Sequence, residues 1–532
     1  MTSVALFELI LALLGAALLL SLVAGRLGFP PAAALVLGGM ALAVAPGLPA
    51  FDLDPDLIMV LFLPPLLLES AYFTVWRDFR ASLGPILSLS LGAVLFTTLV
   101  VGLVAHAVVP ALPWAACFAL GAIVSPPDAV AAKAVLARVA LPRRLVTVLE
   151  GESLVNDASG LVLYRFAVAA ALTGSFNAWA AAGSFAWLAV AGVAVGLACG
   201  LAVDALVRRL RDANAVTVLS FLASYAAEEI HASGVLAVVA CGLMMGGREH
   251  EAFDAHVRRH AVAVWEFVVF VLEALVFVLI GLALRGVLAR TGGELGPLAT
   301  GLPLAVTVTA ACVVARLLWV FPAVYLRRTL SARVRAQEPR PDPRVPLIIG
   351  WAGMRGVVTL AAALALPVDF PGRDPILVAA FAVILFTVLI QGTTLGPLIR
   401  RLRLDPHQSL PEGHLDAAMA RVVMNQAGLA ALERLVSPGS GALQHPRLVE
   451  DYRRRVRASS RDRDERGALA AEKTEHFAAA LLAVRSGRSA LITLHRDNRI
   501  HSSVLRALEG EIDLEELYLK RLAGEAPAHG AA

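Results

Sequence analysis

Charged side chains are scarce in this sequence. Only 17% of the 532 residues are Asp, Glu, Lys or Arg, whereas a soluble domain usually has about 25%. Hydrophobic residues make up 58% of the chain, and the mean hydropathy is +0.73. This balance excludes an ordinary soluble domain and indicates a membrane protein. The net charge of +4 requires no nucleic-acid partner.

Cysteines and nucleotide-binding motifs are also sparse. The four cysteines all lie inside apolar segments, so we expect small packing residues rather than a disulfide framework or a metal centre. The sequence contains no Gly-x-x-x-x-Gly-Lys-Ser/Thr loop, the motif that binds nucleotide phosphates, which disfavours ATP-driven pumping. We expect neither a cofactor nor an enzymatic reaction.

Long apolar runs, by contrast, are abundant. A membrane-spanning helix takes about 20 apolar residues, and fewer where it is short or broken. Thirteen candidate spans follow from this rule: 4–24, 31–47, 55–72, 82–109, 113–138, 144–173, 183–209, 214–231, 233–247, 258–286, 301–327, 345–367 and 375–400. An odd number of spans places the two termini on opposite sides of the membrane.

Arginine is distributed unevenly over the loops. If the C-terminus is cytoplasmic, eighteen arginines fall in inside loops and three, Arg285, Arg290 and Arg373, fall in outside loops. This bias is the positive-inside signal. It predicts a multi-pass protein of the cell membrane with its N-terminus outside and its C-terminus in the cytoplasm. Because moving one span would scramble the bias, it also supports the thirteen spans.

The composition changes near Arg400. Residues 401–532 are more charged, yet a Leu-Ala pattern persists at 427–432 and a Leu-Glu pattern at 514–519. We therefore predict a transmembrane domain at 1–400 and a helical cytoplasmic tail at 401–532. The tail could regulate the membrane domain, but we favour a solvated bundle or a dimerisation element because no ligand motif appears.

A polar stretch begins the sixth span, where residues 151–160 read Gly-Glu-Ser-Leu-Val-Asn-Asp-Ala-Ser-Gly. Charged groups at membrane depth cost roughly 2.5 kcal/mol or more each, so they usually face a site or a water-filled cavity. On a helix, Ser153 lies three residues before Asn156 and four before Asp157. One helix face would then offer hydroxyl, amide and carboxylate oxygens. These suit a hard monovalent cation, and the carboxylate can alternatively hold a proton.

Two of the predicted spans are interrupted. Ser125-Pro126-Pro127-Asp128 breaks the fifth span, since prolines remove backbone donors and clash with preceding carbonyls. Glycines and Arg355 break the twelfth span at 350–359. Breaks at matching places of two halves, spans one to six and eight to thirteen, are typical of a secondary-transporter site. Asp128 could cap the start of the helix that resumes after Pro127, which we favour, or belong to the ion environment. Arg355 could neutralise carbonyl-rich ends on the other broken helix.

The predicted fold class is therefore an all-α polytopic membrane protein with two inverted repeats, two crossed broken helices and a helical tail. The motifs described above, with Phe-Leu-Pro-Pro-Leu-Leu-Leu-Glu at 62–69 and Gln-Gly-Thr-Thr-Leu-Gly-Pro at 391–397, resemble the monovalent cation/proton antiporter family that includes sodium/proton exchangers. The resemblance covers roughly residues 1–400, with the motifs in family order.

The resemblance implies a secondary antiporter that exchanges Na⁺ for H⁺ by alternating access, with K⁺/H⁺ antiport as the alternative. A cation channel is less favoured because no ring or filter of repeated ligands is visible. A scaffold or sensor is disfavoured by the intact carboxylates. The expected partners are Na⁺, or K⁺ or Li⁺, together with H⁺, membrane lipid and a second copy of the chain in a homodimer.

Residue roles follow from the same resemblance. Asp157 matches the family's ion- and proton-carrying aspartate, for which H⁺ and the cation compete. Asn156 before it is typical of the electroneutral branch, which exchanges one cation for one proton. Ser153 and Glu69 match positions at the cation site or on its access path. Asp157 and Ser153 are thus the expected cation ligands, with Asp128 nearby.

Four further charged residues lie within predicted spans: Glu152, Arg316, Arg355 and Lys133. The resemblance implies that Glu152 pairs with an arginine of the eleventh span, and Arg316 is the candidate; we expect this pair and Arg355 to be structural. Lys133 could stabilise the core electrostatically or extend toward the inner face of the membrane, and we favour the second. Relatives often have a threonine before Asp128, whereas Pro127 here offers a carbonyl but no hydroxyl.

Overall fold

The computed structural model describes most of the chain. The described ranges are 3–45, 61–136, 141–174, 177–210, 232–247, 255–290, 295–330, 342–404, 417–435, 445–464, 470–497 and 502–522, with isolated residues between them. Helices fill these ranges, and no β-strand occurs in them. The predicted all-α fold class is therefore confirmed. The chain divides into two compact units, Met1–Pro406 and His407–Ala531.

The described residues up to Leu136 form nine helical segments. They are α1 (Ser3–Leu27), α2 (Pro31–Val44), α4 (Leu63–Phe73), α5 (Trp76–Ala81), α6 (Leu83–Leu87), η1 (Ser88–Ala93), α7 (Val94–Val108), α8 (Trp114–Val124) and α9 (Ala129–Leu136). Segments α6, η1 and α7 form one continuous helical run, Leu83–Val108, which the sequence predicted as a single span.

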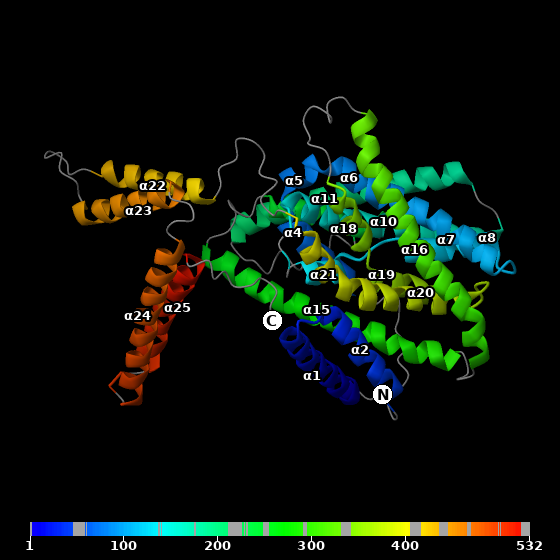
Figure 1. Ribbon diagram of the computed structural model, residues 1–532, viewed down its shortest axis with the longest axis horizontal. Coiled ribbons are helices and arrows are strands. Elements are labelled where there is room, and N and C mark those ends of the chain that lie inside the picture. Colours follow the sequence, from blue (N-terminus) through cyan, green and yellow to red (C-terminus); the bar gives the residue numbers. More distant parts are fainter. Residues whose placement is uncertain are drawn as a thin grey trace. The chain divides into compact units, whose positions relative to one another are not determined.

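The rest of the first unit contains longer helices. They are α10 (Arg143–Thr173), α11 (Ala178–Leu210), α13 (Gly234–Gly246), α15 (Ala255–Arg290), α16 (Leu295–Leu330), α18 (Arg344–Trp351), α19 (Val357–Leu364), α20 (Arg373–Phe386), η2 (Thr387–Gln391) and α21 (Gly392–Leu402). Figure 1 shows α1 and α2 alongside the long helix α15, and both contact it.

Several of these helices are long and apolar enough to cross a bilayer. In the first unit they are Leu83–Val108, Arg143–Thr173, Ala182–Ala205, Val264–Gly286, Gly301–Tyr325 and Arg373–Leu402. Shorter apolar helices at Leu11–Leu27, Pro31–Val44, Trp114–Val124 and Gly234–Gly246 accompany them. The protein is thus a multi-pass membrane protein. The number thirteen stays a prediction, since most of the eighth predicted span, 214–231, lies outside the described residues.

Both predicted interruptions are present. The fifth predicted span divides into α8, which ends at Val124, and α9, which begins at Ala129. The twelfth divides into α18, which ends at Trp351, and α19, which begins at Val357. Prolines cause the first break, and glycines with Arg355 accompany the second. The two breaks therefore place four helix ends inside predicted membrane spans, at Val124, Ala129, Trp351 and Val357.

Two spans contain a turn of π-helix that no sequence pattern indicated. Segment η1 lies in the Leu83–Val108 run, and η2 lies between α20 and α21. Such turns are rare and occur frequently at functional sites. Carbonyls of η1 receive side-chain donors from neighbouring helices: the Trp319 indole donates to Ser88 at 3.0 Å, and the Ser159 hydroxyl donates to Ser90 at 2.6 Å. These bonds fix η1 against α16 and α10.

Small residues let helices of the first unit approach one another closely. A Cβ atom added to Gly39 of α2 would lie 2.3 Å from the Val278 carbonyl oxygen of α15, and one added to Gly281 would lie 2.3 Å from the Val36 carbonyl oxygen. Glycine at such positions is typical of helix packing in membranes, where van der Waals contact replaces the hydrophobic effect. The α2–α15 contact therefore depends on both glycines.

The described residues of the second unit form four helices in two contacting pairs. Helices α22 (Ala417–Glu433) and α23 (Pro446–Asp464) form one pair, and α24 (Ala470–Arg496) and α25 (Ser502–Leu522) form the other. Arg488 of α24 bonds Asp513 at 2.7 Å and Glu516 at 2.8 Å on α25, where Lys520 also pairs with Glu516. The tail pattern thus produces helices joined by partly exposed ion pairs.

Candidate cation site

Helix α10 carries the polar stretch of the sixth predicted span. The helix begins after Pro142 and ends before Gly174, which has φ +69°, a left-handed conformation that glycine adopts without steric cost. Five polar side chains from its middle are buried: Glu152, Ser153, Asn156, Asp157 and Ser159. A helix in apolar surroundings satisfies its own backbone, so these side chains must find partners on other elements or bind a ligand.

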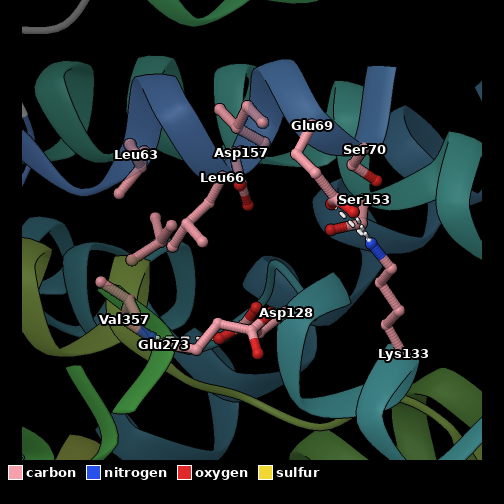
Figure 2. A pocket seen from close by; sticks show the side chains of 12 residues that line it. Leu63, Leu66, Glu69, Ser70, Asp128, Lys133, Ser153, Asp157, Glu273 and Val357 are labelled. Carbon is pink, nitrogen blue, oxygen red and sulfur yellow. Dashed lines mark hydrogen bonds and ion pairs between the residues drawn. The ribbon is translucent and has the colours of Figure 1, made fainter. Parts of the chain in front are cut away.

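A small cavity of about 30 Å³ lies beside this stretch. Its walls come from α4, the α8–α9 break, α9, α10, α15 and α19. The lining residues are Leu63, Leu66, Leu67, Glu69, Ser70, Asp128, Lys133, Ser153, Asp157, Glu273, Val357 and Val358, most of which Figure 2 labels. A polar cavity needs roughly 10–15 Å³ to hold one water, so this one has room for a small ion. Four predicted site residues, Asp157, Ser153, Asp128 and Glu69, meet here.

Asp157 and Asn156 have oxygens without hydrogen-bond partners. Oδ1 of each side chain is buried and accepts no hydrogen bond from any residue the structure describes. A buried acceptor left in this state costs about 1–3 kcal/mol. Asn156 does not line the cavity; its Nδ2 donates to the Pro127 carbonyl at 2.7 Å. The amide thus holds the unwound segment before Asp128 against α10, which sequence reasoning did not predict.

Asp128 contacts the other broken helix. Its Oδ2 accepts from the Val357 N–H at 3.2 Å, and its own N–H donates to the Met354 carbonyl at 2.7 Å. The carboxylate therefore caps α19, where unpaired N–H groups favour negative charge. Gly356 makes this approach possible, because a Cβ atom there would lie 1.7 Å from Asp128 Oδ2. The sequence predicted a capping role but placed it on the helix after Pro127.

Arg355 performs the converse role. Its Nε donates to the Val124 carbonyl at the end of α8 at 2.6 Å, and its Nη1 donates to the Gly353 carbonyl. Its Nη2 lies 3.1 Å from Cys312 Sγ, and its backbone N–H donates to Thr387 Oγ1 at 3.0 Å. A cation at a helix C-terminus is stabilising. Each broken helix thus contributes a charged side chain that stabilises a helix end of the other: Asp128 at the start of α19 and Arg355 at the end of α8.

Glu152 and Arg316 form a buried bidentate ion pair. Arg316 Nη1 and Nη2 donate to the two Glu152 oxygens at 2.5 and 2.8 Å, and both side chains are at most 3% exposed. Nε and Nη2 of Arg316 also donate to the Ile349 carbonyl at 3.2 and 3.1 Å. This fork geometry is specific to arginine. The pair joins α10, α16 and α18, and Gly353 leaves room for the guanidinium.

Lys133 does not extend away from the core, so the favoured interpretation from the sequence is wrong. Its Nζ contacts both carboxylate oxygens of Glu69, across α9 and α4, inside the cavity wall (Figure 2). The physical reason is that the negatively charged Glu69 carboxylate attracts the ammonium strongly at this short range. Glu69 is therefore ion-paired rather than open to a ligand in this conformation.

Sequence reasoning missed several residues at the site. Ser70 lines the cavity beside Glu69, Thr387 caps the Arg355 backbone, and Cys312 contacts the guanidinium. Ser70 could have been found, since it is the second polar residue in an apolar helix. Thr387 and Cys312 lie in apolar runs far along the chain, and nothing in their local sequence distinguishes them.

Comparison with known proteins identifies the family. The family model described as sodium/hydrogen exchanger, transmembrane, matches residues 10–401. This protein belongs to the sodium/hydrogen exchanger family. The predicted resemblance is therefore confirmed, and the family is one of transporters rather than enzymes.

Similar proteins extend this match. The chain is 31% identical over 527 residues to an uncharacterized Na⁺/H⁺ exchanger of Mycobacterium bovis, covering 96% of this chain and 95% of the relative. It is 32% identical over 448 residues to a sodium, potassium, lithium and rubidium/H⁺ antiporter of Bacillus pumilus, covering 80% and 65% respectively. The fold is similar to the sodium proton antiporter MjNhaP1 of Methanocaldococcus jannaschii, with a TM-score of 0.59 at 20% identity over 74% of this chain and 98% of that structure.

Proposed function

We propose that this protein exchanges a monovalent cation, Na⁺ first, for H⁺ across the cell membrane. The observation that carries the proposal is the buried Oδ1 of Asp157, which has no hydrogen-bond partner among the described residues; Asp157 lines a small cavity together with Ser153. A carboxylate in that position is stabilised either by a proton or by a cation. The two ligands cannot occupy it together, which makes them competitors.

The same residues also support electroneutral exchange by alternating access. Four carboxylates line the cavity, but Asp157, which follows Asn156 in the chain, is the one proposed to exchange its ligand, so each cycle moves one cation against one proton. The protonated and cation-bound forms of Asp157 are both neutral overall, which lets the site cross the membrane without moving net charge. The broken helices support this reading, since half-helix ends near a central site are typical of secondary transporters.

Two cations fit the ligand types. Na⁺ and K⁺ are both hard cations that bind oxygen, and the small cavity favours the smaller ion. The antiporter of Bacillus pumilus is named for sodium, potassium, lithium and rubidium, so K⁺/H⁺ exchange is the second candidate. A proteoliposome assay separates them: impose a pH gradient, then add Na⁺, Li⁺, K⁺ or Rb⁺ singly and record proton flux. Dissipation by K⁺ but not Na⁺ would reverse our assignment.

Electroneutral exchange has its own test. We expect Na⁺-driven proton flux to stay constant when valinomycin and K⁺ clamp the membrane potential at several values. A flux that varies strongly with potential would show that a second charge moves in each cycle. Glu69, Asp128 and Glu273 line the same cavity as Asp157 and would then be the candidates for the second proton carrier.

We also propose an orientation and an assembly. The arginine bias supports an N-terminus outside and a tail, residues 401–532, in the cytoplasm. Helix α24 is apolar enough to span by length and composition, but its Arg488 bonds Asp513 and Glu516, and such charges favour water over lipid. Protease access to the tail in inside-out vesicles tests the orientation. Light scattering of the detergent-solubilised protein tests the homodimer.

A further inference from the structure

The cavity contains more charge than one exchange site needs. Four carboxylates line it, those of Glu69, Asp128, Asp157 and Glu273, and Lys133 is the one basic side chain among the described lining residues. Glu150 of α10 interacts electrostatically with both Lys133 and Glu69. A lysine ammonium is itself a compact monovalent cation. The cavity therefore already contains a cation that the chain supplies.

The position of this ammonium is specific. Lys133 Nζ contacts both carboxylate oxygens of Glu69, and both side chains line the same cavity as Ser153 and Asp157 (Figure 2). A transported cation that reached Glu69 would meet the ammonium there, and two like charges at one carboxylate repel. In this conformation Glu69 is thus paired, while Asp157 has an oxygen without a hydrogen-bond partner among the described residues.

The pair also differs from the other ion pair of this unit. The side chains of Lys133 and Glu69 are 37% and 15% exposed, whereas those of Arg316 and Glu152 are 3% and 1% exposed. Arg316 is fixed in addition by the Ile349 carbonyl. Lysine has a flexible four-carbon stem, and a partly exposed pair is screened by solvent. The Lys133–Glu69 pair is therefore the one suited to open and close.

We propose that Lys133 is a tethered competitor of the transported cation. Its ammonium occupies Glu69, lowers the affinity of the cavity for free cations, and leaves Asp157 as the carboxylate that exchanges them. Lys133 is thus a positioning and affinity-setting residue rather than a cation ligand. This inference rests on the proposed cation/proton exchange and adds the group that sets its apparent KM.

The test measures the apparent KM for Na⁺ in proteoliposomes at one fixed pH. Lys133→Met leaves the Glu69 carboxylate unpaired in the cavity, so the KM should fall by about fivefold or more, because an added negative charge attracts the cation. Glu69→Gln leaves the ammonium unpaired, so the KM should rise by a similar factor. The double variant removes both charges, and its KM should return toward the wild-type value. Lys133→Gln, which keeps a donor without charge, should lower the KM as Lys133→Met does.

A pair with only a structural role would not give opposite KM shifts in the two single variants that cancel in the double variant. If the pair served only to join α4 and α9, both single variants would lower the yield of folded protein and neither would lower the KM. An unchanged or raised KM in both folded Lys133 variants would overturn the inference. Lys520→Met is the matched control, because Lys520 pairs with Glu516 at 2.7 Å within the tail and is not a lining residue of the cavity, so the KM of this variant should not change. Absence of Na⁺-dependent proton flux in the wild type would instead reject the proposed function.

Discussion

Glu152 and Asp157 lie on the same helix, both are buried, and their surroundings are opposite. Both oxygens of Glu152 bond Arg316, which bonds Ile349 in turn. Asp157 lines a cavity and has an oxygen without a hydrogen-bond partner among the described residues. A fully paired carboxylate fixes helices, whereas an unpaired one can alternate between ligands. We therefore propose that pairing, rather than burial or residue type, distinguishes a carboxylate with a structural role from one that exchanges ligands.

The largest expected effect comes from Asp157→Asn. Asparagine keeps the shape of the side chain but cannot take up a proton and a cation in turn. The rate of cation-driven proton flux should therefore fall by about 100-fold or more. The melting temperature should change little, because Oδ1 has no hydrogen-bond partner among the described residues to lose. Cation-driven proton flux in reconstituted, monodisperse protein measures the loss.

Asp374→Asn is the matched control for that variant. Asp374 is an exposed carboxylate in the first turn of α20, outside the cavity, so its loss should leave flux unchanged. Wild-type flux in Asp157→Asn would reject Asp157 as the carrier and remove the contrast with Glu152.

Breaking the paired carboxylate should affect stability instead. Arg316→Leu leaves Glu152 buried and unpaired, which typically costs about 3–5 kcal/mol. Thermal unfolding followed by fluorescence size-exclusion chromatography should show a clear drop in melting temperature. The double variant Glu152→Gln with Arg316→Leu should recover part of the loss. Single variants as stable as the wild type would contradict the structural role.

The junction of the broken helices gives an intermediate effect. Gly356→Ala places a methyl group where Asp128 Oδ2 lies, and such crowding typically costs about 1–3 kcal/mol. The cap on α19 should weaken, so both stability and exchange should decrease. Gly286→Ala in α15 is the control, since a Cβ atom there meets nothing within 4 Å. Equal melting temperatures for the two variants would show that the cap is dispensable.

The smallest effect on stability is expected at the partly exposed ion pairs of the tail, Arg488–Glu516 and Lys520–Glu516. The hydrogen bond from Lys520, with Arg488 nearby, lowers the pKa of Glu516 below its usual value. The stabilisation of the α24–α25 pair is therefore present at neutral pH and is lost as pH falls through that lowered pKa. Glu516→Gln should increase hydrogen exchange slightly in α25 at pH 7 and leave Na⁺ KM unchanged. A large drop in the melting temperature would contradict this ranking of exposed and buried pairs.

The sequence predicted much of the fold because the signals were local. Apolar length predicts spans, and Pro126 with Pro127 breaks a helix wherever it lies. Both broken spans and the continuous α10 therefore agree with the structure. The π-helical turns η1 and η2 did not follow from the sequence, and the carbonyls of η1 accept hydrogen bonds from Trp319 and Ser159, which lie far along the chain.

The site was predictable only in part for the same reason. Ser153 and Asp157 share a helix face by spacing alone, and both line the cavity. The attachment of Asn156 to Pro127 and of Lys133 to Glu69 depends on how separate helices meet. A single sequence shows that a buried charge needs a partner, but not which of several partners the packing brings near. Lys133 was misassigned on that account.

The central claim is that a proton and a cation compete for Asp157. Adding Na⁺ to the purified protein in weakly buffered detergent solution, with a pH indicator, measures protons released as the cation binds. We predict release of about one proton per bound Na⁺ in the wild type, and none in Asp157→Asn. Na⁺ binding without proton release, or equal release from Asp157→Asn, would contradict the account.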